Sequence, residues 1–244
     1  MNLIRTAYGV GVRTDAATIP FHTILGIGRN YAEHAKEQGL APPESILVFA
    51  KNPAAAVLHG EDIVIPKACQ DAAKGGEQVD FEGELAVIIG TAARDVPRER
   101  ALSHVLGYCC ANDVSARWWQ KQGSGGQFWR GKSFDTFCPL GPNIVAAADV
   151  PDPQALRLTT RVNGKVMQEA PTSDMIFPVA VLISELSRGL TLLPGTVILT
   201  GTPGGVGMAR TPPVWLREGD LVEVEISGAR GEGFGVLRNR VRVE

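Results

Sequence analysis

Glycine and proline divide this chain into many short apolar segments. Its 244 residues include 28 glycines and 16 prolines, and these residues interrupt the apolar runs before a long helical periodicity can develop. Short apolar runs between turn residues favour a fold rich in β-strands. We predict strands at residues 23–28, 46–51, 84–90, 104–112, 156–168, 195–201 and 220–226.

Helices are expected to be few and short. Asn163 and Gly164 divide the segment 156–168 and predict a hairpin with a type I′ turn. The sequence predicts a mixed α+β fold that is mainly β, with Gly189 as the C-terminal cap of its last helix. The expected helices are 30–39, 97–105, 113–123 and 177–189.

Composition argues for a protein that acts on small molecules. Apolar residues make up 44% of the chain, charged residues 20%, and the net charge is −2, which gives no basic excess for nucleic acid or an anionic membrane. No apolar run approaches the roughly 20 residues of a membrane span, and the first residues lack the apolar core of a secretory signal. We therefore expect a cytoplasmic protein.

The cysteines suggest neither a zinc site nor a disulfide framework. They form no CxxC pair, and two of them are adjacent in a predicted strand, where they face opposite ways. We expect them to pack as small apolar residues; a nucleophilic cysteine is the weaker alternative. The four are Cys69, Cys109, Cys110 and Cys138.

Two carboxylates share one face of the segment VDFEGELAVIIG, residues 79–90. Successive side chains of a strand alternate between faces, so Glu82 and Glu84 point the same way. At a separation of about 7 Å and an effective dielectric near 20, their repulsion is roughly 2 kcal/mol, which calls for a nearby positive group. The alternative is an edge strand with one solvated face.

A third acid, Asp113, follows the apolar strand 104–112. It could simply cap the helix expected at 113–123. Alternatively, Glu82, Glu84 and Asp113 form an all-oxygen set suited to Mg²⁺ or Mn²⁺, with about half of an octahedron left open for substrate or water. Open positions suit Lewis-acid catalysis better than a structural metal.

The segment GRNYAEHAKEQG supplies a candidate general base. If Asn30 caps a short helix, His34 and Glu37 lie on one face of it, and the carboxylate can orient the imidazole and raise its basicity. The alternative is a surface helix in which Glu33 and Glu37 flank Lys36. In GKSFD, residues 131–135, Lys132 could balance the three acids or bind a substrate oxyanion.

The glycine-rich segment LTGTPGGVG, residues 199–207, follows a predicted strand. It lacks GK[ST] and GxGxxG, and no amphipathic helix begins there, so a phosphate-binding loop is rejected. Its backbone N–H groups and the hydroxyls of Thr200 and Thr202 can still face a carboxylate or an enolate.

Six motifs occur along the chain in the order GRNYAEH, VDFEGELAVIIG, GYCCANDVSAR, GKSFDTFCPLGP, VNGKVMQ and ILTGTPGGVG. Together they resemble the catalytic core of the fumarylacetoacetate hydrolase family, in its short acylpyruvase-like branch. The resemblance covers roughly residues 22–243 and implies a mixed β-sandwich or β-roll with few helices, assembled as a homodimer. Residues 21–244 would then be the catalytic domain, with residues 1–20 an extension that can be part of its core.

The resemblance also implies roles for individual residues. Glu82, Glu84 and Asp113 match the positions that bind Mg²⁺ or Mn²⁺, and His34 and Glu37 match the pair that acts on water in hydrolytic members. Lys132 matches the lysine of the GKSFD motif. Positions that touch substrate match Arg29, Arg117, Gln120 and Thr202.

Two features depart from the family pattern. Trp118 and Trp119 follow Arg117, where the family often has an acidic residue, and a glycine-rich insertion occupies 123–126. Both leave the shape of the pocket near Lys132 undetermined by the resemblance.

The predicted activity is metal-dependent hydrolysis of a carbon–carbon bond in a small 2,4-dioxo acid, an acylpyruvate. Decarboxylation of oxaloacetate, or tautomerisation or isomerisation of a 2-oxo acid, is the nearest alternative, because the same metal site stabilises an enolate whichever bond breaks. An alternative from another functional class is a binding protein that has the same fold and is catalytically silent.

Overall fold

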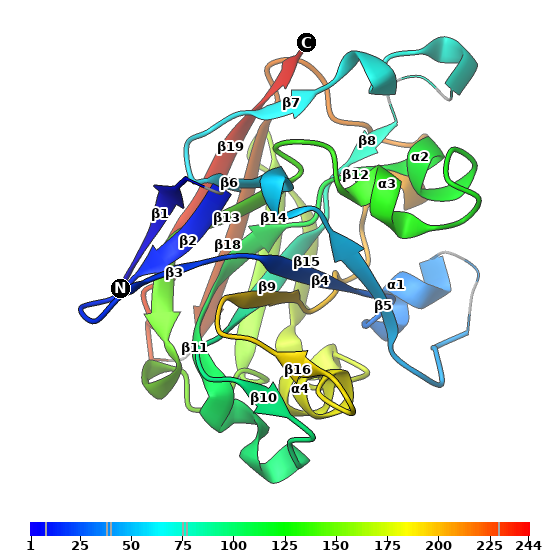
Figure 1. The fold of residues 1–244 in the computed structure, drawn as a ribbon. Coiled ribbons are helices and arrows are strands. Elements are labelled where there is room, and N and C mark those ends of the chain that lie inside the picture. Colours follow the sequence, from blue (N-terminus) through cyan, green and yellow to red (C-terminus); the bar gives the residue numbers. More distant parts are fainter. Residues whose placement is uncertain (8, 38, 40, 75, 77, 229) are drawn as a thin grey trace.

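Two β-sheets form the centre of the molecule (Figure 1). The computed structural model describes residues 1–7, 9–37, 39, 41–74, 76, 78–228 and 230–244. The mainly β fold expected from the short apolar segments is confirmed. In spatial order, the larger sheet contains β5 (Leu47–Lys51), β4 (Thr23–Gly28), β17 (Thr196–Leu199), β9 (Gly83–Ile89), β11 (Val105–Asn112), β13 (Cys138–Ala146) and β6 (Ala56–Leu58).

The second sheet packs against β9 and β11 of the first. Its strands, in spatial order, are β15 (Lys165–Pro171), β14 (Leu156–Val162), β18 (Leu221–Gly228), β19 (Val236–Val243) and β7 (Ile63–Ile65). Smaller sheets join β1 (Asn2–Thr6), β2 (Gly9–Arg13) and β3 (Thr18–Pro20), β8 (Val79–Asp80) with β12 (Ser115–Ala116), and β10 (Ala93–Arg94) with β16 (Thr191–Leu192).

Strand β9 is buried on both faces. It lies between β17 and β11, and every one of its residues is buried. Leu85 and Val87 face the second sheet, where they join a cluster that contains Leu158, while Ala86 and Ile88 belong to a cluster on the opposite face. An edge strand with one solvated face, the alternative reading of 79–90, is therefore wrong, and its carboxylates lie in the protein interior.

The first strands of the chain cover part of that opposite face. Val10 and Val12 of β2 are buried in the same apolar cluster as Ala86 and Ile88 of β9. Burying such side chains stabilises the fold by about 1.5–3 kcal/mol each. Glu82, just before β9, instead contacts Arg117 of α2 (Arg117–Lys121) and Lys132 of α3 (Phe128–Lys132).

The predicted hairpin is present, and most predicted helices are shorter than expected. Asn163 and Gly164 have φ angles of 52° and 77° between β14 and β15, as a type I′ turn requires. Segment 97–105 forms a 3₁₀ helix, Arg98–His104, and the expected helix at 113–123 begins only at Arg117. Gly189, with a φ of 67°, lies two residues beyond the capping residue Ser187.

The α-helices are α1 (Ala32–Glu37), α2 (Arg117–Lys121), α3 (Phe128–Lys132) and α4 (Val179–Leu186). The predicted helix 30–39 runs past α1 into Gln38, which is outside the described residues. None of the helices in the described part of the chain has the length and apolar character that crossing a membrane would need. Further 3₁₀ turns occupy Pro53–Ala55, Lys67–Cys69, Ala72–Lys74, Ala147–Asp149, Thr172–Asp174 and Gly207–Ala209.

The buried cysteines give a prediction about thiol reactivity. All four are free and buried, and burial raises the pKa of each thiol, to about 12 for Cys69. At pH 8 a thiol with such a pKa is ionised in only about one molecule in 10,000, and the thiolate is the reactive form.

We expect Ellman's reagent to label no thiol of the native protein within minutes, and to label four per chain after unfolding in guanidinium chloride. Rapid labelling of the native protein would show that at least one thiol is accessible and ionised.

Candidate active site and metal centre

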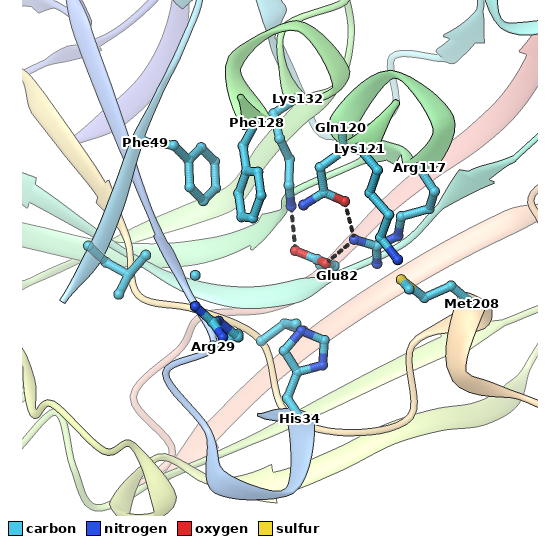
Figure 2. Close-up of a pocket in the computed structure, with 13 residues that line it drawn as sticks. Arg29, His34, Phe49, Glu82, Arg117, Gln120, Lys121, Phe128, Lys132 and Met208 are labelled. Carbon is cyan, nitrogen blue, oxygen red and sulfur yellow. Dashed lines mark hydrogen bonds and ion pairs between the residues drawn. The ribbon is translucent and has the colours of Figure 1, made fainter. Parts of the chain in front are cut away.

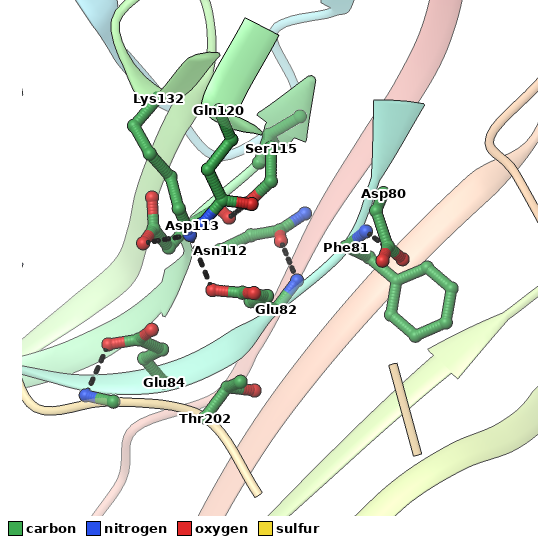
Figure 3. Close-up of polar contacts among 12 residues, drawn as sticks. Asp80, Phe81, Glu82, Glu84, Asn112, Asp113, Ser115, Gln120, Lys132 and Thr202 are labelled. Carbon is green, nitrogen blue, oxygen red and sulfur yellow. Dashed lines mark hydrogen bonds and ion pairs between the residues drawn. The ribbon is translucent and has the colours of Figure 1, made fainter. Parts of the chain in front are cut away.

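The three candidate metal ligands converge in space. Strands β9 and β11 are antiparallel neighbours that pair Ala111 with Glu84, and the Asp113 amide donates to the Glu82 carbonyl at 2.8 Å. This pairing brings one carboxylate oxygen of each acid within 4.8 Å of the others (Figure 3). All three side chains are buried, so oxygen atoms that the sequence places far apart can share one cation.

Gly83, between the two glutamates, allows a close approach of the two sheets. A Cβ atom at this position would overlap the Thr160 hydroxyl of β14. The Gly83 amide donates to the Gln168 side chain at 3.0 Å, and its carbonyl accepts from the Thr202 hydroxyl at 2.9 Å. The backbone that carries Glu82 and Glu84 is thus fixed from both sides.

Two buried lysines hold Asp113. Lys132 of α3 donates to Glu82 Oε2 and to Asp113 Oδ2, both at 2.6 Å. Lys51, the last residue of β5, donates to Asp113 Oδ1 at 2.5 Å. The positive charge that the repulsion between Glu82 and Glu84 calls for is therefore present, and Lys51, which the sequence did not single out, adds to it at Asp113.

Arg117 is engaged mainly with acids of the protein itself. Its Nε and Nη2 atoms donate to Asp80 Oδ2 at 2.9 and 2.7 Å, and Nη1 lies 2.7 Å from Glu82 Oε1. The Gln120 side chain accepts from Nη1 at 3.0 Å. Arg117 and Gln120 both line the cavity described below, but the arginine also fixes the rotamer of Glu82.

Burial and charge act differently on the two glutamates. For Glu84, burial raises the pKa well above its usual range, and the nearby Asp113 and Glu82 raise it further. For Glu82, burial also raises the pKa, but Lys132 and Arg117 outweigh it and bring the value to about 2. Glu84 is thus the carboxylate that gains most from an added cation.

The cluster suits a divalent cation. It contains four buried acids, Asp80, Glu82, Glu84 and Asp113, against the three buried cations Lys51, Arg117 and Lys132, which leaves one negative charge in excess. Within the described residues, no ion pair reaches Glu84. An all-oxygen donor set with excess negative charge fits a hard ion such as Mg²⁺ or Mn²⁺. Capping by Asp113 is ruled out, because α2 begins at Arg117 and its N-cap residue is Ala116.

His34 and Glu37 form the expected pair. His34 Nδ1 lies 2.7 Å from Glu37 Oε1, and Glu37 Oε2 accepts from the Gly205 amide at 2.7 Å. A carboxylate partner places the proton of a neutral imidazole on Nδ1, so Nε2 carries the lone pair. The alternative of a surface helix, in which Glu33 and Glu37 flank Lys36, holds only for Glu33 and Lys36. Their side chains are exposed, and Lys36 Nζ lies 3.8 Å from Glu33 Oε1.

Asn30 has a different role from the predicted helix cap. Its side-chain oxygen accepts from the Phe177 amide at 2.8 Å, while its nitrogen donates to the carbonyls of Phe177 and Thr200 at 3.0 and 2.8 Å. Asn30 therefore joins the end of β4 to the segment before α4 and to the glycine-rich turn, and so fixes where α1 begins.

The turn at 199–207 supports the metal ligands. The Gly201 amide donates to Glu84 Oε2 at 2.6 Å (Figure 3), and the Thr200 hydroxyl donates to the Leu85 carbonyl at 2.9 Å. The Thr200 hydroxyl thus faces the backbone of β9, although the sequence also allowed it to face a carboxylate or an enolate. Thr202 lines the cavity, with its hydroxyl proton directed to Gly83.

Glu82 lies in the wall of a cavity of about 340 Å³, between Lys132 and Gln120 on one side and Arg29 and His34 on the other (Figure 2). Glu82 and His34 line this cavity, whereas their partners Glu84, Asp113 and Glu37 are not among its lining residues. The apolar part of the wall consists of Ile27, Gly28, Phe49, Phe128 and Met208, and the polar part of Arg29, His34, Glu82, Arg117, Gln120, Lys121, Lys132 and Thr202.

Sequence reasoning missed Lys51, Asp80, Lys121 and Gln168. Lys51 ends an otherwise apolar predicted strand, and Asp80 lies in the same acidic segment as Glu82, so an unexplained charge inside an apolar run was the available signal for both. For Gln168 and Lys121 no local signal exists, because their roles depend on contacts between distant segments.

Fold and site together define a β-rich protein with a buried carboxylate cluster that could hold a metal ion. A model of the fumarylacetoacetate (FAA) hydrolase C-terminal domain matches residues 23–242, and the chain belongs to this family. The resemblance of the six motifs is thereby confirmed.

Relatives and solved structures agree with this assignment. The chain is 44% identical to oxaloacetate tautomerase FAHD2A, mitochondrial, of Bos taurus over 89% of this chain and 66% of that protein. It is 42% identical to oxaloacetate tautomerase YisK of Bacillus subtilis over 91% of this chain and 70% of that protein. The structure of fumarylpyruvate hydrolase from Pseudomonas aeruginosa, in complex with Mn²⁺ and pyruvate, superposes with a TM-score of 0.83, 30% identity and full coverage of both chains.

Replacing Glu84 tests the metal centre. We expect Glu84→Gln to weaken Mn²⁺ binding beyond the roughly 10–100-fold loss typical of outer-shell changes, because it removes a direct oxygen ligand and the excess charge. The metal-free variant should melt no lower than the parent, since the replaced carboxylate is costly to ionise. Calorimetric titration with Mn²⁺ measures the first effect; Glu169→Gln, at an exposed site, is the control. Unchanged affinity would exclude Glu84 as a ligand.

Replacing Lys51 tests the charge balance. Lys51→Met leaves Asp113 with Lys132 alone, and removing one partner of a buried ion pair costs about 3–5 kcal/mol of unfolding free energy. Mn²⁺ should stabilise this variant more than the parent, because the cation compensates the lost charge. Urea unfolding with and without Mn²⁺ measures both effects, with the exposed Lys165→Met as the control. A variant as stable as the parent would contradict the role of Lys51.

Proposed function

We propose that this chain is a divalent-metal-dependent enzyme that interconverts the keto and enol forms of oxaloacetate or a closely related 2-oxo acid. The observation that carries the proposal is that His34 and Glu82, one of the three converging acids, face the same cavity. The relatives named oxaloacetate tautomerase support this choice of reaction. The chain spans about two thirds of the length of the bovine relative. The tautomerase activity of the relatives is therefore assigned to this chain only as part of the proposal.

The cluster would hold the metal through Glu82, Glu84 and Asp113. Bound there, a divalent cation would polarise the 2-oxo group and stabilise the negative charge of an enolate. Lys132 and Arg117 keep Glu82 ionised and oriented for this role. Lys51 and Lys132 each donate to one oxygen of Asp113 and so orient its carboxylate.

His34 is the proposed proton carrier. With Nδ1 held by Glu37, Nε2 can remove a proton from C3 of the keto form and return it to the oxygen on C2. Glu37 stabilises the imidazolium that exists between these two steps, and the Gly205 amide keeps Glu37 in place. One base that takes and returns a proton is sufficient for tautomerisation.

Hydrolysis of an acylpyruvate is the second candidate. The His34–Glu37 pair can equally remove a proton from a water molecule that attacks the distal carbonyl, and the similarity to fumarylpyruvate hydrolase favours this reaction. Decarboxylation of oxaloacetate would use the same enolate without an attacking water.

Activity measurements separate the candidates. Enol oxaloacetate should lose its ultraviolet absorbance in the presence of protein and Mg²⁺ or Mn²⁺ without release of pyruvate, and treatment with EDTA should abolish the reaction. A panel of acylpyruvates tests hydrolysis, and pyruvate release from oxaloacetate tests decarboxylation. Hydrolysis far faster than tautomerisation would overturn the first candidate. Oxalate mimics the enolate. If the protein does not bind oxalate in a metal-dependent manner, a binding protein without catalytic activity is favoured.

His34→Asn tests the proton carrier. We expect it to lower kcat by about 10²–10⁴-fold, the usual contribution of general acid–base catalysis, while Mn²⁺ affinity stays close to that of the parent. His22→Asn, at an exposed histidine, is the matched control. Equal loss of metal binding and turnover would mean that His34 supports the cluster instead of carrying the proton.

A further inference from the structure

Two cationic side chains in the cavity wall have no acidic partner among the residues that the structure describes. Arg29 and Lys121 both line the cavity, yet neither takes part in an ion pair within the described chain. Glu82, the acid in the same wall, is already paired with Lys132 and Arg117. The cavity wall therefore carries more positive charge than the protein neutralises, which favours an anionic ligand.

Arg29 and Lys121 lie on different sides of Glu82 (Figure 2). Arg29 follows β4, in the segment that leads to His34, whereas Lys121 is the last residue of α2, the helix that carries Arg117 and Gln120. A small dianion held at the carboxylate cluster by one end can direct its other end toward the side of Lys121.

The two departures from the family pattern combine to place Lys121. The rings of Trp118 and Trp119 meet edge to face with centroids 5.0 Å apart, and Gly123 packs so closely on them that a Cβ atom would overlap the Trp118 ring. The Gly126 amide donates to the Lys121 carbonyl at 2.8 Å. The glycine-rich insertion thus folds back on the tryptophans and fixes the backbone of Lys121 at the edge of the cavity.

The electrostatic environment of Lys121 favours an added anion. Partial burial and the neighbouring Arg117 both lower the pKa of Lys121. A carboxylate near the ammonium group would offset this penalty, and Arg117 itself is saturated by Asp80, Glu82 and Gln120.

We propose that Lys121 is a specificity residue that binds the distal carboxylate of a 2-oxo dicarboxylate, and so selects dicarboxylates over 2-oxo acids with an apolar end. This inference rests on the proposed function, because it takes the oxo-acid end of the substrate to lie at the carboxylate cluster. A lysine merely solvated at the rim would show no such selectivity.

A matched pair of substrates tests the role of Lys121. Oxaloacetate and 2-oxobutanoate have the same carbon skeleton and the same C3 protons, and differ in a carboxylate against a methyl group. In Lys121→Met we expect KM for oxaloacetate to rise about tenfold, as for a charge-assisted hydrogen bond at a partly exposed site. KM for 2-oxobutanoate and kcat for both substrates should stay within about twofold of the parent values, a smaller change than the loss of one lysine–carboxylate contact produces. Lys121→Arg should restore KM for oxaloacetate, and Lys165→Met is the surface control.

Binding of unreactive ligands separates this inference from the proposed function. Malate and 2-hydroxybutanoate differ in the same distal group, and calorimetry with Mg²⁺-loaded protein compares their affinities without turnover. Preferential weakening of malate by Lys121→Met supports the specificity role even if the parent turns over neither 2-oxo acid, a result that would overturn only the proposed reaction. Equal effects on both ligands, or none on either, would overturn the role of Lys121.

Discussion

The pairing of buried carboxylates with buried lysines determines how the rest of the site is arranged. Each ion loses several kcal/mol of hydration in the interior, and this loss is tolerated only where opposite charges and hydrogen bonds replace water. Asp113 meets this requirement through Lys51 and Lys132, which brings β5 and α3 to the ends of β9 and β11. Glu84 has no such cation within the described chain. One acid thus remains for a metal ion, and the same cluster joins the core to the cavity that Glu82 lines.

Much of this arrangement could be predicted from sequence, because the signals are local. Alternation along 79–90 places Glu82 and Glu84 on one face, and the Asn163–Gly164 turn specifies its hairpin. Helical spacing alone brings His34 to Glu37. Strand β9 was located correctly, although its burial on both faces depends on neighbours that a single segment does not reveal. The ordered motifs then added what no local pattern contains: the convergence of Asp113, from a separate strand, on the two glutamates.

Other features depend on contacts between distant segments. Lys51 and Asp113 are 62 positions apart, and the apolar run that ends at Lys51 does not reveal which acid its ammonium group contacts. Strand β13 was missed because Pro139, Gly141 and Pro142 interrupt it, although its partners β11 and β6 supply enough pairing to keep it extended. Asn30 suited a helix cap by residue type, yet its two contacts with Phe177 use the side chain to join separate loops. In each case tertiary partners decided between conformations that the local sequence allowed.

Gly83 restricts substitution in the interior of the site, whereas the rim of the cavity is under no such restriction from this contact. Any larger residue there would collide with Thr160 of the opposing sheet. The close contact between the two sheets therefore fixes the backbone between Glu82 and Glu84. The rim is formed differently, by the short helices α2 and α3: α2 carries Trp118, Trp119 and, at its end, Lys121, which lines the cavity. Changes confined to the outer part of these helices therefore alter the rim of the cavity, as long as Arg117 and Lys132, which hold Glu82 from the same two helices, are kept.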